Sequence, residues 1–198
     1  MRMRALITTG ATAAGLLLGP AAAAVAAPPP SPSAARVADE HTFDFESGTE
    51  GWVAGKDDRL PDGTVTWSSK QAKSGTHSLE FWLDGLQDDG TLWVSRELPV
   101  PPGRTSIDVE MSFWVWSASD TPTISWWVVA QAGRTAPTQE DDFTKLEYAE
   151  HAGWHPFTYR TTIDTRGLST FHASFGLSVT WEDDTRVHNF DLAQIKVT

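Results

Sequence analysis

The sequence predicts an all-β protein, a β-sandwich of two antiparallel sheets, and three observations lead to this fold class. From His41 onwards the apolar segments are short and rich in Val, Ile, Thr, Phe and Trp, the residues that favour strands. Gly, Pro, Asp or Asn bound almost every segment, as the turns between strands require. Neither a convincing helical pattern nor a repeat of fixed period is present, which argues against propellers and solenoids.

Ten segments are expected to be strands, and their spacing is typical of a sandwich. In chain order they cover residues 42–46, 64–69, 77–84, 91–98, 106–117, 123–131, 144–150, 157–163, 170–181 and 187–197. Turn signals such as Pro61-Asp62-Gly63 and Pro101-Pro102-Gly103 separate neighbouring segments, because Pro and Gly fix turn conformations.

Alternation between apolar and polar residues assigns a face to the side chains of three expected strands, since successive side chains point to opposite sides. The core-facing residues are Leu79, Phe81, Leu83, Phe113, Val115, Phe171, Ala173, Phe175, Leu177 and Val179. The opposite face carries Glu80, Trp82, Asp84, Ser112, Trp114, Trp116, His172, Ser174, Ser178 and Thr180. Several tryptophans therefore lie on the wrong face for the core. The segment 124–129 is apolar on both sides, so alternation assigns it no face.

The N-terminal residues 1–26 have the features of a secretory signal peptide. Arg2 and Arg4 precede an apolar run, and Ala24-Val25-Ala26 offers an A-x-A cleavage site. An uncleaved membrane anchor is less favoured, because the apolar run is too short for a full span. Residues 27–40 are rich in Pro, Ala and Ser and are expected to form a disordered leader. Residues 41–198 then form one β-sandwich domain of a secreted, extracellular protein.

Composition excludes several classes of partner and chemistry. The formal net charge of −11 lacks the clustered Lys and Arg that nucleic acids and anionic membranes attract. Because cysteine is absent, the chain has no disulfide framework, no thiol nucleophile and no thiolate metal site. We therefore expect no nucleic-acid partner and no membrane contact after signal cleavage. A monomer is also expected.

Three short motifs open, continue and close the expected domain. They are Phe-Asp-Phe-Glu-Ser-Gly-Thr-Glu-Gly-Trp at 43–52, Ser-Gly-Thr-His-Ser-Leu at 74–79, and Asn-Phe-Asp-Leu-Ala-Gln-Ile at 189–195. With these motifs the chain resembles the jelly-roll carbohydrate-binding modules of secreted bacterial glycanases, in the galactose-binding-domain-like family. The resemblance implies a jelly-roll β-sandwich that binds carbohydrate without catalysis. The same fold also carries adhesion, protease-associated and structural domains.

The resemblance also implies a structural calcium ion between the first and last strands. Carried over to this chain, it implies Glu46 and Asp191 as carboxylate ligands and the backbone at Gly75 as a carbonyl donor. Many members carry a second acid in the last-strand motif, whereas this chain has Leu192 after Asp191. The alternative, in which both acids only cap turns or face solvent, stays open.

The ten tryptophans are the unusual feature of the composition. Flat aromatic side chains bind the apolar C–H faces of sugar rings over a large area, while polar neighbours bind the hydroxyl groups. The candidate ligand-binding residues are Trp82, Trp114, Trp116, Trp127, Glu80, Arg160 and His172. Trp52 is expected in the core, and Trp67, Trp93, Trp154 and Trp181 are open to either role.

No catalytic residue is assigned. The nearest pairs of acids to a glycosidase arrangement are Glu80 with Asp84 and Asp108 with Glu110, and neither belongs to a recognised signature. His151 and His155 have a spacing that suits a metal only on a helix. Gly153 and Pro156 oppose a helix there, so a loop is the favoured interpretation.

The sequence therefore predicts a secreted, non-catalytic protein that binds a polysaccharide or oligosaccharide through exposed tryptophans. A secreted structural or protein-interaction domain is the alternative, because an exposed aromatic surface can equally contact a protein. A small glycoside hydrolase or polysaccharide lyase is a further alternative.

Overall fold

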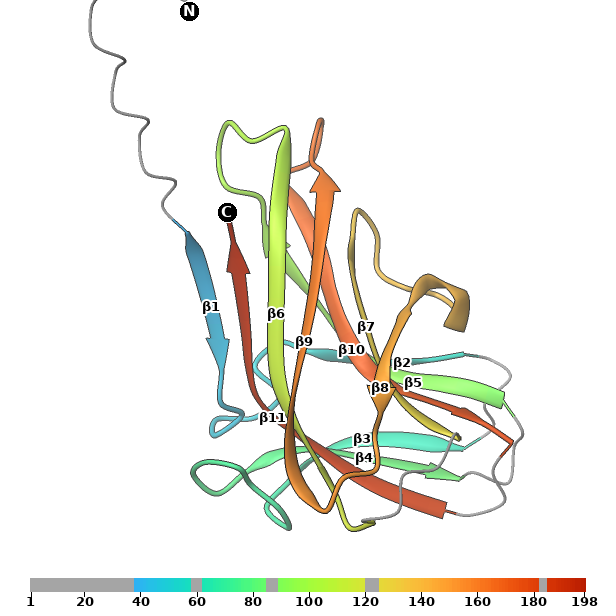
Figure 1. The fold of residues 1–198 in the computed structure, drawn as a ribbon. Helices are drawn as coiled ribbons and strands as arrows, with labels where there is room; N and C mark the ends of the chain where they lie inside the picture. Colours follow the sequence, from blue (N-terminus) through green and yellow to red (C-terminus); the bar gives the residue numbers. More distant parts are fainter. Residues whose placement is uncertain (1–37, 58–61, 85–88, 120–124, 182–184) are drawn as a thin grey trace, which may run out of the picture. The chain divides into compact units, whose positions relative to one another are not determined.

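The computed structural model describes residues 38–57, 62–84, 89–119, 125–181 and 185–198, which belong to one compact unit that starts near Arg36 (Figure 1). The predicted signal peptide and almost all of the predicted leader lie outside the described residues. The elements in chain order are β1 (Asp39–Phe43), β2 (Val53–Lys56), β3 (Gly63–Ser68), β4 (Ser78–Asp84), β5 (Asp89–Pro99), β6 (Ser106–Ser117), β7 (Trp126–Gly133), the 3-10 turn η1 (Glu140–Asp142), β8 (Thr144–Tyr148), β9 (Gly153–Asp164), β10 (Thr170–Thr180) and β11 (Thr185–Val197). In the described residues, no helix has the length and apolar character needed to cross a membrane.

The strands form two antiparallel sheets that pack face to face. Sheet A has the order β3-β4-β11-β6-β9, with β1 paired to the C-terminal half of β11. Sheet B has the order β2-β5-β10-β7-β8. From β4 to β7, and again from β8 to β11, consecutive strands alternate between the sheets. This arrangement confirms the predicted all-β jelly-roll sandwich of two antiparallel sheets.

Most strand boundaries lie close to those expected from the sequence, and β6 has the same bounds. The prediction missed β2, whose Val-Ala-Gly-Lys sequence lacks an apolar alternation and which lies at the edge of sheet B. It also began β9 at Phe157, whereas the strand starts at Gly153 and runs through Pro156. Pro156 is tolerated because β9 is the edge strand of sheet A, where a missing N–H leaves no ladder partner unsatisfied. β1 begins at Asp39, two residues before the expected start of the domain.

Aromatic residues from both sheets join in the core. The Phe175 ring of β10 packs on Phe113 of β6 and Phe190 of β11, at centroid distances of 4.8 Å and 5.3 Å. Trp52, only 3 % exposed, lies 4.6 Å from Phe175, which confirms its predicted place in the core. The core-facing residues predicted from alternation in β4, β6 and β10 are all buried. Trp126 is buried as well, so its neighbour Trp127 points outward.

The outer face of sheet B is covered by the segment between β7 and β8. Phe143 packs on Trp93 at 5.2 Å, and Ser178 donates a hydrogen bond of 2.9 Å to Glu140. Ser174 and Ser178 are therefore fully buried, although alternation places them opposite the core. Trp93 fits against the sheet because a Cβ atom at Gly55 would lie only 2.5 Å from its Nε1. Alternation finds the core-facing side of a strand but not what covers the other side.

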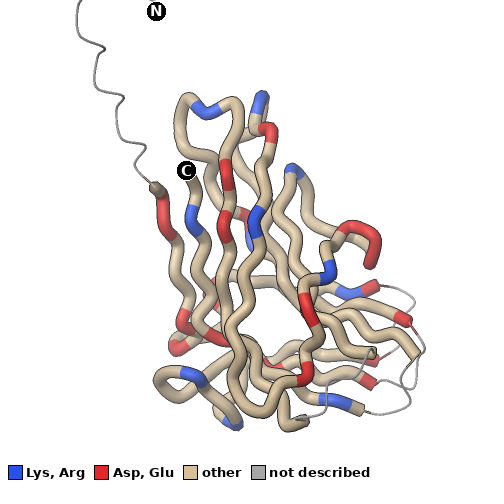
Figure 2. The backbone as a smooth tube through the Cα atoms, viewed as in Figure 1, with Lys and Arg blue, Asp and Glu red and all other residues tan. Residues whose placement is uncertain are grey.

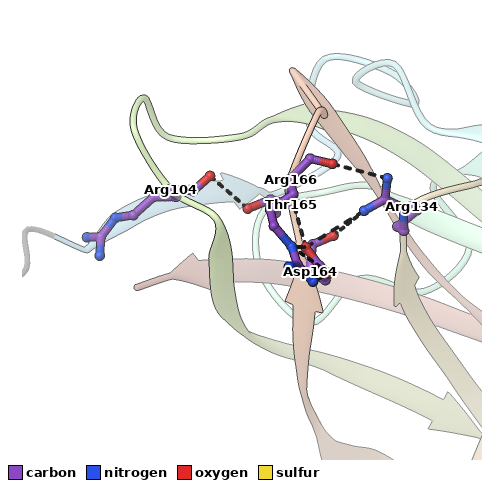
Figure 3. Close-up of polar contacts among 5 residues, drawn as sticks. All are labelled: Arg104, Arg134, Asp164, Thr165 and Arg166. Carbon is purple, nitrogen blue, oxygen red and sulfur yellow. Dashed lines mark hydrogen bonds and ion pairs between the residues drawn. The ribbon is translucent and has the colours of Figure 1, made fainter.

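A polar cluster ties three segments together at one end of the sandwich (Figure 3). Asp164, the last residue of β9, accepts hydrogen bonds from the backbone N–H and the guanidinium of Arg166. Arg134, after β7, donates to the Asp164 carbonyl at 2.6 Å. The Thr165 hydroxyl donates to the carbonyl of Arg104, in the connection between β5 and β6, at 3.0 Å. These contacts fix the turn between β9 and β10.

Candidate functional site

The predicted ligand-binding residues lie on two opposite faces of the sandwich and do not form one site. Five of them lie on the outer face of sheet A, the face turned away from sheet B: Glu80 and Trp82 on β4, Trp114 and Trp116 on β6, and Arg160 on β9. The other two lie on the outer face of sheet B: Trp127 on β7 and His172 on β10.

The outer face of sheet A carries a row of aromatic and polar residues across four strands. Asn189 of β11 pairs with Glu80 on one side and with Trp116 on the other. Trp116 in turn pairs with Trp154 of β9. Paired residues in antiparallel strands point to the same face, so these side chains are neighbours. Both tryptophans are half-buried.

A cavity of about 320 Å³ opens beside this row, and we call it the Trp116 cleft. Its lining residues are Lys70, Gln71, Glu80, Trp116, Ser117, Ala118, Ser119, Glu150, Thr185, Arg186, Val187 and Asn189. They come from β4, β6, β11 and the segments that follow β3, β6 and β8. The cleft therefore combines one aromatic side chain with several charged and amide groups.

Two buried polar side chains in the Trp116 cleft have hydrogen-bonding capacity that the described residues do not use. Glu80 is only 7 % exposed and accepts hydrogen bonds from Lys70 Nζ at 2.8 Å and Ser68 Oγ at 2.9 Å. A carboxylate has about four acceptor positions, so Glu80 can accept further bonds. Asn189 is fully buried and donates to Ser78 Oγ at 3.1 Å. Its Oδ1 has no hydrogen-bond partner among the described residues.

The cleft also contains a buried acid that contacts a buried histidine. The carboxylate Oε1 of Glu150 lies 3.6 Å from His188 Nε2 and 3.8 Å from Arg186 Nε. Burial lowers the pKa of His188, which favours the neutral imidazole. Burial also acts to raise the pKa of Glu150, but the contacts with His188 and Arg186 outweigh it, and the pKa is lowered. Glu150 is therefore a buried carboxylate next to Arg186.

Arg160 lies away from the tryptophans. Its Nε forms an ion pair of 2.7 Å with Glu110 across β6 and β9, where an acidic stretch of one strand faces a basic residue of the other (Figure 2). The two residues line a separate cavity of about 440 Å³ that contains no aromatic side chain.

The outer face of sheet B has a larger cavity of about 540 Å³, the Trp93 groove. Its lining residues are Gly51, Val53, Ala54, Gly55, Trp93, Ser95, Arg96, Glu97, Ala136, Pro137 and His172. Trp93 is only 4 % exposed and Val53 is 68 % exposed, so the groove offers an aliphatic wall but no open aromatic ring. Trp127 lies outside the groove and packs on Tyr148 at 4.3 Å.

The residues predicted to bind calcium lie around one loop, residues 73–77. Glu46 accepts hydrogen bonds from the backbone N–H groups of Thr76 and His77. It also accepts one from the Thr76 hydroxyl. Gly75 lies against Glu46, because a Cβ atom there would be 2.3 Å from Cδ of the carboxylate. Asp191 accepts N–H bonds from Lys73 at 2.7 Å and from Ser74 at 3.1 Å.

This arrangement of donors does not fit a calcium ion, which needs oxygen atoms free to coordinate it. Both oxygens of Glu46 are engaged by three donors: the Thr76 N–H is shared between them, the Thr76 hydroxyl donates to Oε2 and the His77 N–H donates to Oε1. The N–H groups of His77 and Thr76 lower the pKa of Glu46, whereas burial raises the pKa of Asp191. An ion would have to displace the N–H donors of the loop, and the calcium site stays a prediction.

Sequence reasoning missed several residues in and beside the Trp116 cleft. Asn189 belongs to the last-strand motif, but nothing in the motif indicates an unpaired oxygen. Trp154 was left open to either role, and its pairing with Trp116 follows only from strand register. Glu150 and His188 carry no local signal, because their contact joins residues far apart in the chain.

No protein-family model matches the chain, and no curated protein sequence matches it. Among solved structures, the CBM22-1 xylan-binding domain of Paenibacillus barcinonensis Xyn10C is similar with a TM-score of 0.51 and 19 % identity, over 83 % of this chain and 97 % of that chain. The CBM22-2 xylan-binding domain of the same protein has a TM-score of 0.53 and 15 % identity, over 80 % and 99 %. The chain has the fold of jelly-roll carbohydrate-binding modules. This confirms the fold that the sequence motifs implied.

Proposed function

We propose that the protein binds a polysaccharide or oligosaccharide non-covalently in the Trp116 cleft. The observation that carries the proposal is the placement of half-buried Trp116 beside the buried Asn189, whose Oδ1 has no partner among the described residues. An indole face contacts the C–H face of a sugar ring. The amide oxygen accepts a hydrogen bond from a sugar hydroxyl, and Glu80 and Lys70 bind others.

The fold and the N-terminal sequence support the same proposal. Both single-domain neighbours described above are named as xylan-binding domains, which makes xylan the first polymer to test. The basic start, apolar run and A-x-A site at residues 1–26 support export of the protein. Outside the cell the protein would meet polysaccharides as soluble polymers or surfaces.

Affinity electrophoresis through native gels tests the proposal. Gels containing xylan, mixed-linkage β-glucan, mannan or no polymer are compared for the unaltered protein, Trp116→Ala and Trp127→Ala. We expect retardation in at least one polymer gel. Truncating a central aromatic contact typically lowers affinity by about 2 kcal/mol, so Trp116→Ala should bind roughly 30-fold more weakly.

Trp127→Ala is the matched control, because Trp127 is also half-buried but lies on the opposite face. It should be retarded like the unaltered protein. Loss of retardation in Trp127→Ala but not in Trp116→Ala would move the binding site to sheet B. Unchanged mobility in every gel would favour a structural or protein-interaction domain. Far-ultraviolet circular dichroism of each variant separates lost binding from lost folding.

A catalytic function is the second candidate, because two buried acids, Glu80 and Glu150, line the same cleft. Glycoside hydrolysis uses a pair of carboxyl groups that flank the scissile bond. Glu80 is held in place by hydrogen bonds from Lys70 and Ser68. We expect no release of reducing ends from any polymer that retards the protein. If reducing ends are released by the unaltered protein but not by Glu150→Gln, the protein is instead a glycoside-cleaving enzyme.

A further inference from the structure

Three potential metal ligands meet where the chain passes from sheet B to sheet A. They are Glu147 on β8, His151 in the crossover and His155 on β9. One ligand atom from each lies within 4.8 Å of the others. The rings of His151 and His155 stack at a centroid distance of 3.9 Å, and His151 Nε2 lies 3.7 Å from Glu147 Oε1.

The crossover produces this cluster without a helix. No helix forms at the histidine pair, as Gly153 and Pro156 predict, but the loop interpretation is wrong for His155, which belongs to β9 together with both of these residues. Gly153 adopts φ 78°, which is unfavourable for other residues, and this conformation turns the chain into β9. His151 and His155 lie on either side of this glycine, and their rings stack on each other. The expectation that such a pair needs a helix to bind metal does not take this geometry into account.

The cluster contains a buried polar atom without a hydrogen bond among the described residues. His151 Nε2 is shielded from solvent and makes no hydrogen bond within the part of the chain that the structure describes. Buried nitrogen atoms are normally hydrogen-bonded, so an unsatisfied one requires an explanation. A bound cation supplies one, because a neutral imidazole nitrogen is a metal ligand.

We propose that Glu147, His151 and His155 bind a divalent transition-metal ion, with Zn²⁺ as the ion that fits best. Zinc takes imidazole nitrogen and carboxylate oxygen at about 2.0–2.2 Å, which places neighbouring ligand atoms roughly 3.3–3.6 Å apart in a tetrahedron. The observed separation of 3.7 Å between Glu147 and His151 is already close to this value. Three protein ligands leave the fourth position to water or another small ligand.

The ion would connect the two sheets at an open edge of the sandwich. β8 is the edge strand of sheet B and β9 is the edge strand of sheet A. In the described residues they pair with β7 and β6, respectively, and not with each other. A metal held by Glu147 on one edge and His155 on the other would therefore fasten the edges together. An ion that binds only the folded protein raises its melting temperature with concentration.

Thermal unfolding of the metal-free protein tests this proposal, with Zn²⁺ alone as the probe and no polysaccharide present. We expect Zn²⁺ to raise the melting temperature progressively. His151→Gln and His155→Gln should abolish the increase, and Glu147→Gln should weaken it. His41→Gln, on β1 in another part of sheet A, is the control and should keep it.

Binding of Co²⁺ gives a readout that does not depend on stability. Its visible absorption should appear in the unaltered protein and in His41→Gln, and be lost in His155→Gln. No change in melting temperature with Zn²⁺, or an equal increase in all variants, would overturn the proposal. Because the experiment contains no sugar, its result is independent of carbohydrate binding.

Discussion

The ammonium group of Lys73 lies over the ring of Trp114, with Nζ 3.9 Å from the ring centroid. The backbone N–H of the same lysine donates to Asp191 at 2.7 Å. Both contacts hold the segment between β3 and β4 against the outer face of sheet A. A sugar that stacks on Trp114 must displace Lys73, whereas Trp116 opens into the cleft.

Removing Lys73 should therefore strengthen carbohydrate binding. A cation–π contact at an exposed site is worth about 0.5–1 kcal/mol, so Lys73→Ala should raise affinity by roughly two- to fivefold if the ligand reaches Trp114. Lys70→Ala is the comparison, because Lys70 lines the cleft and should lower affinity. Isothermal titration with a soluble oligosaccharide measures both. Weaker binding by Lys73→Ala would mean that the lysine contacts the ligand.

Glu46 should stabilise the protein without any ion. Glu46→Ala leaves the N–H groups of Thr76 and His77 without their acceptor, so its melting temperature should be lower than that of the unaltered protein even in EDTA. The same melts with added calcium test the calcium prediction that the sequence resemblance implied. A rise with calcium that Glu46→Ala abolishes would support it. Equal melting temperatures in calcium and EDTA would contradict it.

Acid should weaken the contact between Asp164 and Arg166 (Figure 3). The guanidinium of Arg166 holds the pKa of Asp164 far below its usual range. Its stabilising contribution is therefore complete above the unfolded pKa of about 3.9 and is lost as the pH falls toward the folded pKa. Asp164→Asn should lower the melting temperature most at neutral pH, with a smaller difference in acid. Arg166→Gln should show the same pH dependence of the melting temperature as Asp164→Asn. A loss of melting temperature that is equal at neutral and acidic pH would contradict this account.

Phe175 should be among the most sensitive positions of the core. Its ring contacts Trp52, Phe113 and Phe190, which come from both sides of the sandwich. Phe175→Ala should lower the free energy of unfolding by about 3–5 kcal/mol, through lost contacts and the cavity left behind. Urea denaturation measures the change. The exposed Thr158→Ala on β9 is the control and should shift it by less than about 0.5 kcal/mol.

Local sequence pattern was sufficient to predict most of the strands and the core-facing residues of three of them. Leu79, Phe81 and Phe113 follow the strand period of two, and all are buried. The pattern failed where the apolar residues of a strand do not alternate with polar ones, as in β2. The pattern also did not predict that Phe143 covers Trp93, because that contact depends on the path of the long connection between β7 and β8.

The candidate site was predicted only in part, because it depends on which sheet each strand joins. Trp116 and Trp127 are on consecutive strands, and alternation correctly points both away from the core. Consecutive strands here belong to opposite sheets, however, so these two residues face opposite sides of the protein. Only long-range pairing, such as Asn189 with Glu80 and Trp116, determines which side chains can bind one ligand.

The pairing of β1 with β11 has a practical consequence for attaching the protein to a surface. Asp39 lies opposite Val197, so the first and last strands begin and end at the same end of sheet A (Figure 1). Asn189, at the Trp116 cleft, is roughly 25 Å from Val197 along β11, at about 3.3 Å per residue. A linker or solid support joined at either end would therefore leave the cleft accessible to long polymer chains.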